Sequence, residues 1–181
     1  MLEPPASAVL VEAFANTVDL DLGTDELAGP EQLSAWLAGQ GLLGPGVRLT
    51  GEVHAMCLRL RAGIREQLGA HIGDEPSPDT VAAANAVLDA LPVFIGMGGD
   101  RPALSPAPGL PPGERALAAL AIAWSELRTT GDAARLKRCA EHTCGWVFWD
   151  VSKNRSRRWC SMRVCGNRAK ARRHAVRHTP A

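Results

Sequence analysis

Residues 138–174 read RCAEHTCGWVFWDVSKNRSRRWCSMRVCGNRAKARRH and decide how the C-terminal part of the chain folds. Two close cysteine pairs stand in this stretch, Cys139 with Cys144 and Cys160 with Cys165, with 4 residues inside each pair and 15 between the pairs. This is a usual pattern of a structural zinc site, because each short pair wraps one side of the ion and the segment between them folds back. The spacing therefore predicts one structural Zn²⁺ held by four thiolates.

Other uses of these cysteines remain open at this point. Two disulfides are the alternative, but the N-terminal MLEPPASAVLVEAF has no basic start, so we expect no secretory signal and a cytoplasmic protein with reduced thiols. His142, His174 and His178 are competing ligands, although four thiolates already complete a tetrahedron. Cys57 lies among apolar residues at helical spacing and is interpreted as a core residue.

The segments around the cysteines predict a small finger with a β-hairpin and a C-terminal helix. GWVFWD (145–150) and RRWC (157–160) have strand composition, and VSKN (151–154) between them has turn composition. After Cys165 the composition favours a helix, with Asn167 as a candidate capping residue. A cysteine pair, a hairpin and a helix in this order are typical of a treble-clef zinc finger.

The N-terminal part predicts a helical domain. Residues 9–20 fit a helix or a strand, and apolar residues recur at helical spacing in 29–43, 50–69, 77–91 and 113–131. Residues 96–113 contain 5 Gly and 5 Pro and predict a loop. The expected fold class is mainly α, with a helical domain at 1–131 followed by the finger at 132–181. No apolar run approaches the roughly 20 residues of a membrane span, so we expect no membrane partner.

The stretch 138–174 closely resembles the CGNR zinc finger, named for the tetrapeptide found here at residues 165–168. In that family the finger follows a helical domain called ABATE, which is assigned to stress-induced transcription regulation. FANTVDL (14–20), LSAWLAGQGLL (33–43) and LRLRAGIREQL (58–68) are similar to segments of that domain. The resemblance implies the zinc ligands that the spacing also predicts, which are Cys139, Cys144, Cys160 and Cys165.

The charge of the chain is divided between its two parts. Residues 1–134 hold 7 Lys+Arg and 17 Asp+Glu, a net charge of −10, whereas residues 135–181 hold 13 and 2, a net charge of +11. Zinc with four thiolates carries −2, so about two cations would neutralise it. The remaining cations predict an anionic partner, for which duplex DNA leads, with RNA as a variant. Docking on an acidic protein, or on the acidic half of the same chain, is the alternative.

A helical wheel sorts the cations after Cys165. Lys170, Arg173 and Arg177 form one stripe, and Ala171 faces the other way, toward the hairpin. Arg168 and Arg172 are also candidates to brace the finger, for example by pairing with Asp150. The predicted nucleic-acid-binding residues are Arg155, Arg157, Arg158, Arg163, Asn167, Arg168, Lys170, Arg172, Arg173 and Arg177, with Lys153 as an extension.

The helical domain holds a second candidate site. Polar residues interrupt apolar segments there and could line a pocket for a small anionic effector or make core hydrogen bonds; they are Asn16, Thr17, Arg61, Arg65 and Asn85. No phosphate-binding glycine loop, HExxH motif or nucleophile with its base is present, so we expect no enzyme. The sequence predicts a zinc-dependent DNA-binding transcription regulator whose helical domain senses a ligand or forms a homodimer. The alternative is a protein–protein interaction module.

Overall fold

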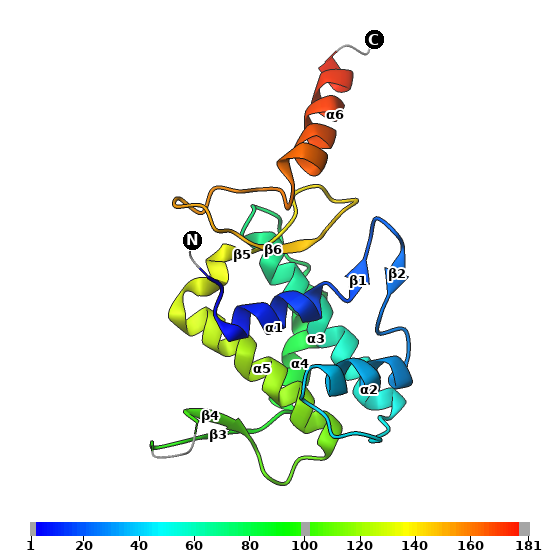
Figure 1. Cartoon of the computed structure of the whole chain (residues 1–181), viewed down its shortest axis with the longest axis vertical. Coiled ribbons are helices and arrows are strands. Elements are labelled where there is room, and N and C mark those ends of the chain that lie inside the picture. Colours follow the sequence, from blue (N-terminus) through cyan, green and yellow to red (C-terminus); the bar gives the residue numbers. More distant parts are fainter. Residues whose placement is uncertain (1–2, 99–101, 178–181) are drawn as a thin grey trace.

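The computed structural model of the chain describes residues 3–98 and 102–177, without the side chains of 175–177. The α-helices are, in chain order, α1 (Ala6–Ala15), α2 (Pro30–Gly39), α3 (Gly51–Ala70), α4 (Pro78–Asp89), α5 (Pro112–Thr130) and α6 (Asn167–Arg177). Short strands pair as antiparallel hairpins: β1 (Val18–Asp19) with β2 (Thr24–Asp25), β3 (Val93–Ile95) with β4 (Leu104–Pro106), and β5 (Leu136–Arg138) with β6 (Val147–Trp149). The predicted class, mainly α with a small C-terminal finger, is confirmed (Figure 1).

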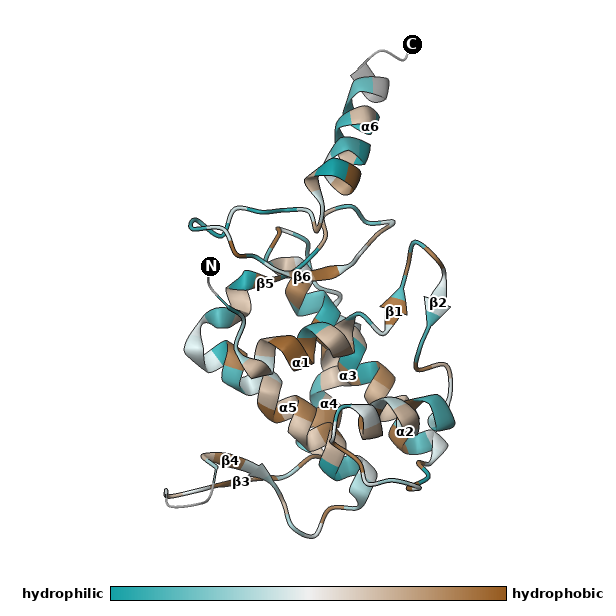
Figure 2. Ribbon diagram, in the orientation of Figure 1, coloured by the Kyte–Doolittle hydropathy of each residue, from teal (hydrophilic) through white to brown (hydrophobic). Residues whose placement is uncertain are grey.

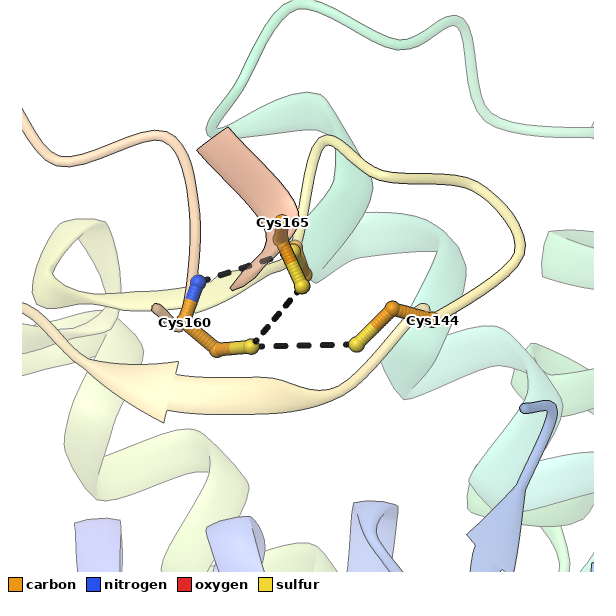
Figure 3. Close-up of side chains that lie close together, drawn as sticks. Cys144, Cys160 and Cys165 are labelled. Carbon is orange, nitrogen blue, oxygen red and sulfur yellow. Dashed lines mark hydrogen bonds between the residues drawn. The ribbon is translucent and has the colours of Figure 1, made fainter. Parts of the chain in front are cut away.

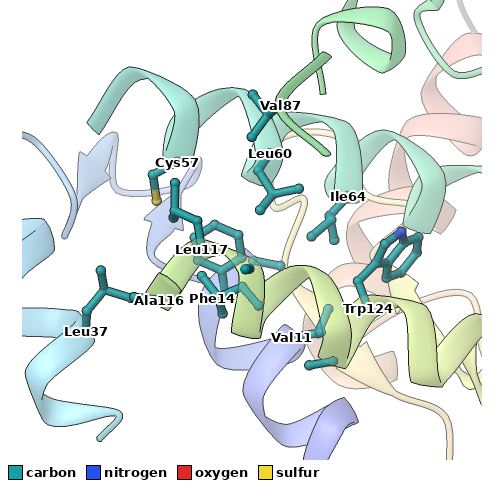
Figure 4. Packing of buried hydrophobic residues seen from close by; sticks show 14 of the residues in the cluster. Val11, Phe14, Leu37, Cys57, Leu60, Ile64, Val87, Ala116, Leu117 and Trp124 are labelled. Atoms are coloured by element: carbon teal, nitrogen blue, oxygen red, sulfur yellow. The ribbon is translucent and has the colours of Figure 1, made fainter. Parts of the chain in front are cut away.

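The helix α3 is the centre of the helical domain. Thr50 starts it, because its hydroxyl accepts a hydrogen bond from Val53 N–H at 3.2 Å. The apolar stripe predicted from the sequence is buried in full; it consists of Val53, Cys57, Leu60, Ile64 and Leu68. Figure 4 shows this stripe meeting side chains of α1, α2 and α5 in one core. The buried face of α3 that the 3.6-residue periodicity predicts is therefore confirmed.

The ambiguous segment 9–20 divides into two elements. The helix α1 ends at Ala15, and β1 begins at Val18. Between them, the N–H of Asn16 still closes the last helical turn by donating to Glu12 O at 3.0 Å. Thr17 then donates its hydroxyl to Phe14 O at 2.8 Å and directs the chain away from the helix axis.

A hairpin replaces part of the predicted loop. Within 96–113, residues 104–106 form β4 and pair with β3, with Phe94 opposite Ser105. The loop prediction rested on glycine and proline, which weaken a strand, and proline in particular cannot donate to a ladder. Pro106 is tolerated because it stands opposite Val93 at a position where the backbone groups point away from the partner strand.

The hairpin of the finger is formed by other residues than predicted. β6 lies within the predicted strand 145–150, but its partner is β5, and residues 157–160 form no strand. The predicted pairing of 145–150 with 157–160 is therefore wrong. Residues 157–160 instead lie beside the first cysteine pair, where Ala140 N–H donates to Arg158 O at 2.8 Å.

The finger shares the core of the helical domain. Leu136, Val147 and Trp149 of the β5–β6 hairpin are buried in the same apolar cluster as the helices. Beyond the hairpin, a π-helical turn η2 (Met162–Gly166) runs into α6, which extends away from the body (Figure 1) and is mostly hydrophilic (Figure 2). None of the helices in the described part of the chain is long and apolar enough to span a bilayer.

Candidate metal centre and cationic surface

The four predicted ligand cysteines converge on one point. Their Sγ atoms all lie within 4.8 Å of one another. Cys160 Sγ lies 3.7 Å from the Sγ atoms of both Cys144 and Cys165, as drawn in Figure 3. Four sulfurs held about 2.3 Å from one Zn²⁺ lie about 3.8 Å apart in a tetrahedron. The cluster therefore fits a single zinc ion.

A tight turn in the β5–β6 connection places the first cysteine pair. The N–H groups of Cys144 and Gly145 both donate to Glu141 O at 2.9 Å. Gly145 has a φ of 56°, which glycine adopts without a steric penalty. The Cys139 N–H closes the base of this turn by donating to Trp146 O at 2.8 Å. The turn thus presents both thiols on the same side.

The second pair lies around another turn, η2, since Cys160 stands two residues before it and Cys165 lies within it. Ser161 follows Cys160 and caps η2, since its hydroxyl accepts from Val164 N–H at 3.3 Å. The two pairs are linked directly, because Cys160 N–H donates to Cys139 Sγ at 3.5 Å. Asn167 does not cap α6 as predicted. Its side-chain amide donates instead to Arg163 O at 2.8 Å, within the continuous run from η2 into α6.

Burial disfavours ionised thiols in this cluster. Burial, together with the neighbouring thiols, raises the pKa of Cys160 far above its usual value, and burial raises the pKa of Cys165 to about 12. A divalent cation, when bound, supplies the positive charge that allows the four sulfurs to ionise together. The donor set is thus suited to zinc and poorly suited to free thiolates.

The competing uses of the cysteines are not supported. All five cysteines are free thiols, and the 3.7 Å sulfur separations exceed the roughly 2.05 Å of a disulfide bond. Within the described residues the ligand cluster consists of cysteines alone and includes neither His142 nor His174. His178 lies outside the described residues. Cys57 is buried in the helical core, and burial raises its pKa to about 12, as for an inert core thiol.

Both side-chain carboxylates of residues 135–174, Glu141 and Asp150, are buried. Glu141 has no exposed area, and it accepts hydrogen bonds from Thr143 Oγ1 at 3.0 Å and from Arg172. These bonds, chiefly that of Arg172, outweigh burial and lower the pKa of Glu141. Asp150 is equally buried and pairs with Lys137 Nζ at 2.8 Å. Burial raises its pKa, but the bonds from Lys137 and Ser152 outweigh this and lower the pKa to about 2.

Three of the predicted nucleic-acid-binding arginines are braces. Arg157 donates to Cys160 O at 2.7 Å, and its guanidinium lies 4.8 Å from the ring centre of Phe148. Arg172 pairs with Glu141, and Arg168 pairs with Asp21 of the β1–β2 turn at 3.1 Å. The bracing role foreseen for Arg168 and Arg172 is present, although their partners are not Asp150, which Lys137 occupies.

The other predicted cations are exposed. Their side chains have no hydrogen-bond or ion-pair partner among residues 3–98 and 102–174; they are Lys153, Arg155, Arg158, Arg163, Lys170 and Arg173. The side chain of Arg177 lies outside the described residues. Ala171 is exposed as well, so its predicted contact with the hairpin is wrong. The reason is that α6 extends from the finger and makes its main contacts with η2 (Figure 1).

The finger docks on the acidic helical domain through other cations. Arg138 of β5 pairs with Glu66 at 3.1 Å and with Asp74 at 3.0 Å, both in or just after α3. Arg135 is buried, but it acts within the finger, where it donates to the carbonyls of Asp150 and Ser152 at 3.0 Å. The sequence did not predict these roles of Arg135 and Arg138, because the composition of a basic segment does not show which of its cations are paired.

The predicted effector pocket is not assembled. Asn16 is bonded to the backbone of Val147, Arg65 donates to Ala15 O at 2.6 Å and to Gly145 O at 2.9 Å, and Thr17 accepts from Arg61 at 2.9 Å. Burial lowers the pKa of Arg65 to about 10, so its charge is retained at neutral pH.

Asn85 lies apart from these residues. It lines a cavity of about 170 Å³ together with residues of α3, α4 and α5, including Gln67 and Trp124. Because each of the other four polar side chains is committed to a protein partner, the core hydrogen-bonding interpretation fits them, and the five residues do not share one pocket.

The fold and the site define a class of protein, a helical domain with a four-cysteine zinc finger docked on its core. Comparison with family models assigns both parts. The model of the CGNR zinc finger matches residues 135–178. The model of the ABATE domain, described as "Putative stress-induced transcription regulator", matches residues 8–131. The chain therefore belongs to the ABATE family and carries a CGNR zinc finger, as the resemblance implied. A comparison with curated proteins gives no match.

Proposed function

We propose that the chain is a zinc-dependent transcription regulator whose finger binds the phosphates of duplex DNA. The observation that carries this proposal is the sorting of charge within the finger. Within residues 135–174 both carboxylates, Glu141 and Asp150, are buried and paired, whereas six cations there are exposed and have no partner among the described residues. A surface with cations alone attracts the regularly spaced negative charges of nucleic acid.

The geometry gives zinc a structural role in this activity. Cys139 and Cys144 around the turn before β6 and Cys160 and Cys165 around the turn before α6 would hold the ion, and its binding would therefore stabilise the point where α6 leaves the body. Arg157 and Arg172 support the same turns through Cys160 O and Glu141. Lys170 and Arg173 on α6 and Arg163 on η2 then remain available for phosphates. Phosphate contacts give affinity and orientation without reading the base sequence.

The salt dependence of binding tests the proposal. Labelled duplex is titrated with the zinc-loaded protein at several salt concentrations, and the logarithm of the affinity is plotted against that of the salt concentration. If the six exposed cations each contact a phosphate, the slope is about −5. A flat line contradicts DNA binding through this surface.

Matched double variants localise the contacts. Lys170→Ala with Arg173→Ala removes two exposed cations of α6, and we expect the slope to become less steep by about 2 while one zinc per chain is retained. The control is Arg48→Ala with Arg59→Ala, which removes two exposed arginines of the helical domain that have no side-chain partner among the described residues. The control variant should bind like the unmodified protein. An equal weakening of DNA binding in both double variants would mean that the total charge of the protein, and not the cations of the finger, determines the affinity.

The same assay separates the alternatives. Single-stranded RNA and duplex RNA of the same sequence are added as competitors, and tighter binding of either would make RNA the target. An acidic protein partner that used the same cations would be displaced by DNA. We also propose a non-catalytic role, because four thiolates leave zinc no open position for a substrate water. A cytoplasmic location is proposed as well, because free thiols persist in a reducing compartment. Turnover of any compound in a metabolite screen would contradict the non-catalytic role.

A further inference from the structure

The β3–β4 hairpin exposes an apolar strand. Successive residues of β3 are open to solvent, with 55% of Phe94 and 76% of Ile95 exposed, and Met97 just after the strand is 99% exposed. Residues 90–98 read ALPVFIGMG and contain no charged side chain. An exposed strand edge of this composition is a template for pairing with another chain.

The backbone of β3 has a free edge. Ala107 N–H donates to Pro92 O and Gly96 N–H donates to Ala103 O, which fixes the alternation of the ladder. In that alternation Phe94 bonds to Ser105, whereas the N–H and C=O groups of Val93 and Ile95 point away from β4. The hairpin is a sheet of two strands within the described residues, so no third strand there uses these groups.

The two edges of the hairpin are not equivalent. β4 lies between β3 and α5 (Figure 1) and packs against that helix. Its outward position at Pro106 also lacks an N–H donor. Proline, charge and coverage by a helix are the devices that block unwanted pairing at a sheet edge. β4 has two of these devices, and β3 has none.

We propose that β3 pairs with β3 of a second copy of this chain and forms a two-fold dimer with a continuous four-stranded antiparallel sheet. A two-fold axis at Ile95 lets the free N–H and C=O groups of the two Ile95 residues bond to each other. The same register sets Val93 opposite Met97 of the second copy and Phe94 opposite its Gly96. Each exposed apolar side chain thus gains an uncharged neighbour across the new ladder.

A second copy is favoured over another partner by charge and by symmetry. The helical half carries a net charge of −10, so two copies approach with least repulsion at an uncharged edge such as residues 90–98. An antiparallel strand is self-complementary under a two-fold axis, which is the usual symmetry of a homodimer. The hairpin lies at the end of the molecule opposite α6 (Figure 1), so this dimer leaves both fingers open.

Sedimentation equilibrium of the zinc-loaded full chain, over a wide range of protein concentrations and without DNA, tests the dimer. We expect twice the mass of the chain at the higher concentrations and the monomer mass for Ile95→Lys at all of them, because the axis places the two added charges opposite each other. The control is Leu22→Lys, which changes an equally exposed leucine of the β1–β2 turn, 75% against 76%, and should still form the dimer.

Hydrogen exchange gives a second readout on the unmodified protein. The amides of Val93 and Ile95 should become protected as the protein concentration rises, while the exposed amides of the β1–β2 turn should not. A monomer at every concentration overturns the proposal and leaves the edge to another protein. A dimer that Ile95→Lys does not weaken overturns the assigned surface. Neither result bears on DNA binding by the finger, which is measured separately.

Discussion

Asn16 and Val147 exchange two hydrogen bonds although 131 residues separate them in the sequence. Asn16 Nδ2 donates to Val147 O at 2.9 Å, and Val147 N–H donates to Asn16 Oδ1 at 2.8 Å. The side-chain amide thus satisfies both backbone groups of a fully buried residue in β6, as a neighbouring strand would. The helical domain and the finger are joined by a specific polar contact in addition to their shared apolar core.

Asn16→Ala should destabilise the zinc-loaded protein. The change leaves the Val147 N–H and C=O buried without partners, which costs about 1–3 kcal/mol per unsatisfied group. The free energy of unfolding, measured by urea denaturation, is therefore expected to fall by at least that amount. Asn85→Ala is the control, because Asn85 is an exposed residue of α4 without a hydrogen bond among the described residues. Equal losses in the two variants would contradict the role given to Asn16.

The sequence predicts well what depends on local pattern. The spacing of Cys139, Cys144, Cys160 and Cys165 predicts the metal cluster, because four thiolates can satisfy one ion only if the chain folds back between the pairs. The periodicity of residues 53–68 predicts the buried face of α3, because that face recurs with the helical repeat.

The contacts between distant segments could not be predicted in this way. The strand character of 145–150 is visible in the composition, but its pairing with β5 depends on packing against distant helices, since β5 packs against α3 and β6 packs against α1. In the same way, the helical wheel separates Arg172, a candidate brace, from Arg173 in the exposed stripe, but it suggests Asp150 and not Glu141 as the partner of Arg172. The fold decides which carboxylate Arg172 meets, because Asp150 is already paired with Lys137.

Gly63→Ala should loosen the contact between α3 and α4. A Cβ at Gly63 would stand 2.2 Å from Ala84 Cβ, and both positions lie in helices that cannot shift independently of the core. Overpacking of this kind costs about 1–3 kcal/mol. We expect a lower thermal midpoint for this variant in calorimetry.

Gly39→Ala is the matched control for Gly63→Ala. Gly39 is the last residue of α2, and a Cβ there would have no atom within 4 Å. Alanine is the better helix former by up to about 1 kcal/mol, so this variant should be as stable as the unmodified protein or more stable. A loss of stability in Gly39→Ala, or none in Gly63→Ala, contradicts the close approach of the two helices.

Removal of one ligand should unfold the part of the finger that follows β6. Cys144→Ala is expected to abolish stoichiometric zinc binding, because three sulfurs no longer close the tetrahedron. Hydrogen exchange should then speed up across residues 151–174, whereas α3 and α5 keep their protection. β5 and β6 should keep part of theirs, since Leu136, Val147 and Trp149 are packed in the helical core.

Cys57→Ala is the control for ligand removal. Cys57 is a free cysteine like the ligands, but it is buried on α3 outside the cluster. Elemental analysis should find one zinc per chain in this variant and none in Cys144→Ala. A chelator should reproduce the exchange pattern of Cys144→Ala in the unmodified protein. Zinc retained by Cys144→Ala would show that the ion is held elsewhere.

Asp25 links the β1–β2 hairpin to α3. Its two carboxylate oxygens accept from Arg61 at 2.7 and 2.6 Å, and one of them also accepts from Leu27 N–H at 2.8 Å. The bond from Arg61 is the main cause that lowers the pKa of Asp25 below its ordinary value of 3.8, against a smaller opposing effect of burial. The carboxylate is therefore held in its ionised form by folding.

Asp25→Asn should lower the free energy of unfolding at neutral pH, and this destabilisation should disappear in acid. Because the pKa in the folded state is the lower one, the stabilisation is present in full above pH 3.8, the value of the unfolded chain, and is lost as the pH falls through the folded value. The free energy of unfolding of the variant should thus approach that of the unmodified protein as the pH falls below 3.8. The two free energies of unfolding are compared at each pH, so that the effect of zinc loss in acid, which both proteins share, cancels in their difference.

The control is Asp89→Asn, which tests the general effect of removing a charge. Asp89 is an exposed residue of α4, and its carboxylate has no partner in the described residues. A difference for Asp25→Asn that grows in acid would show that Arg61 does not stabilise the ionised carboxylate.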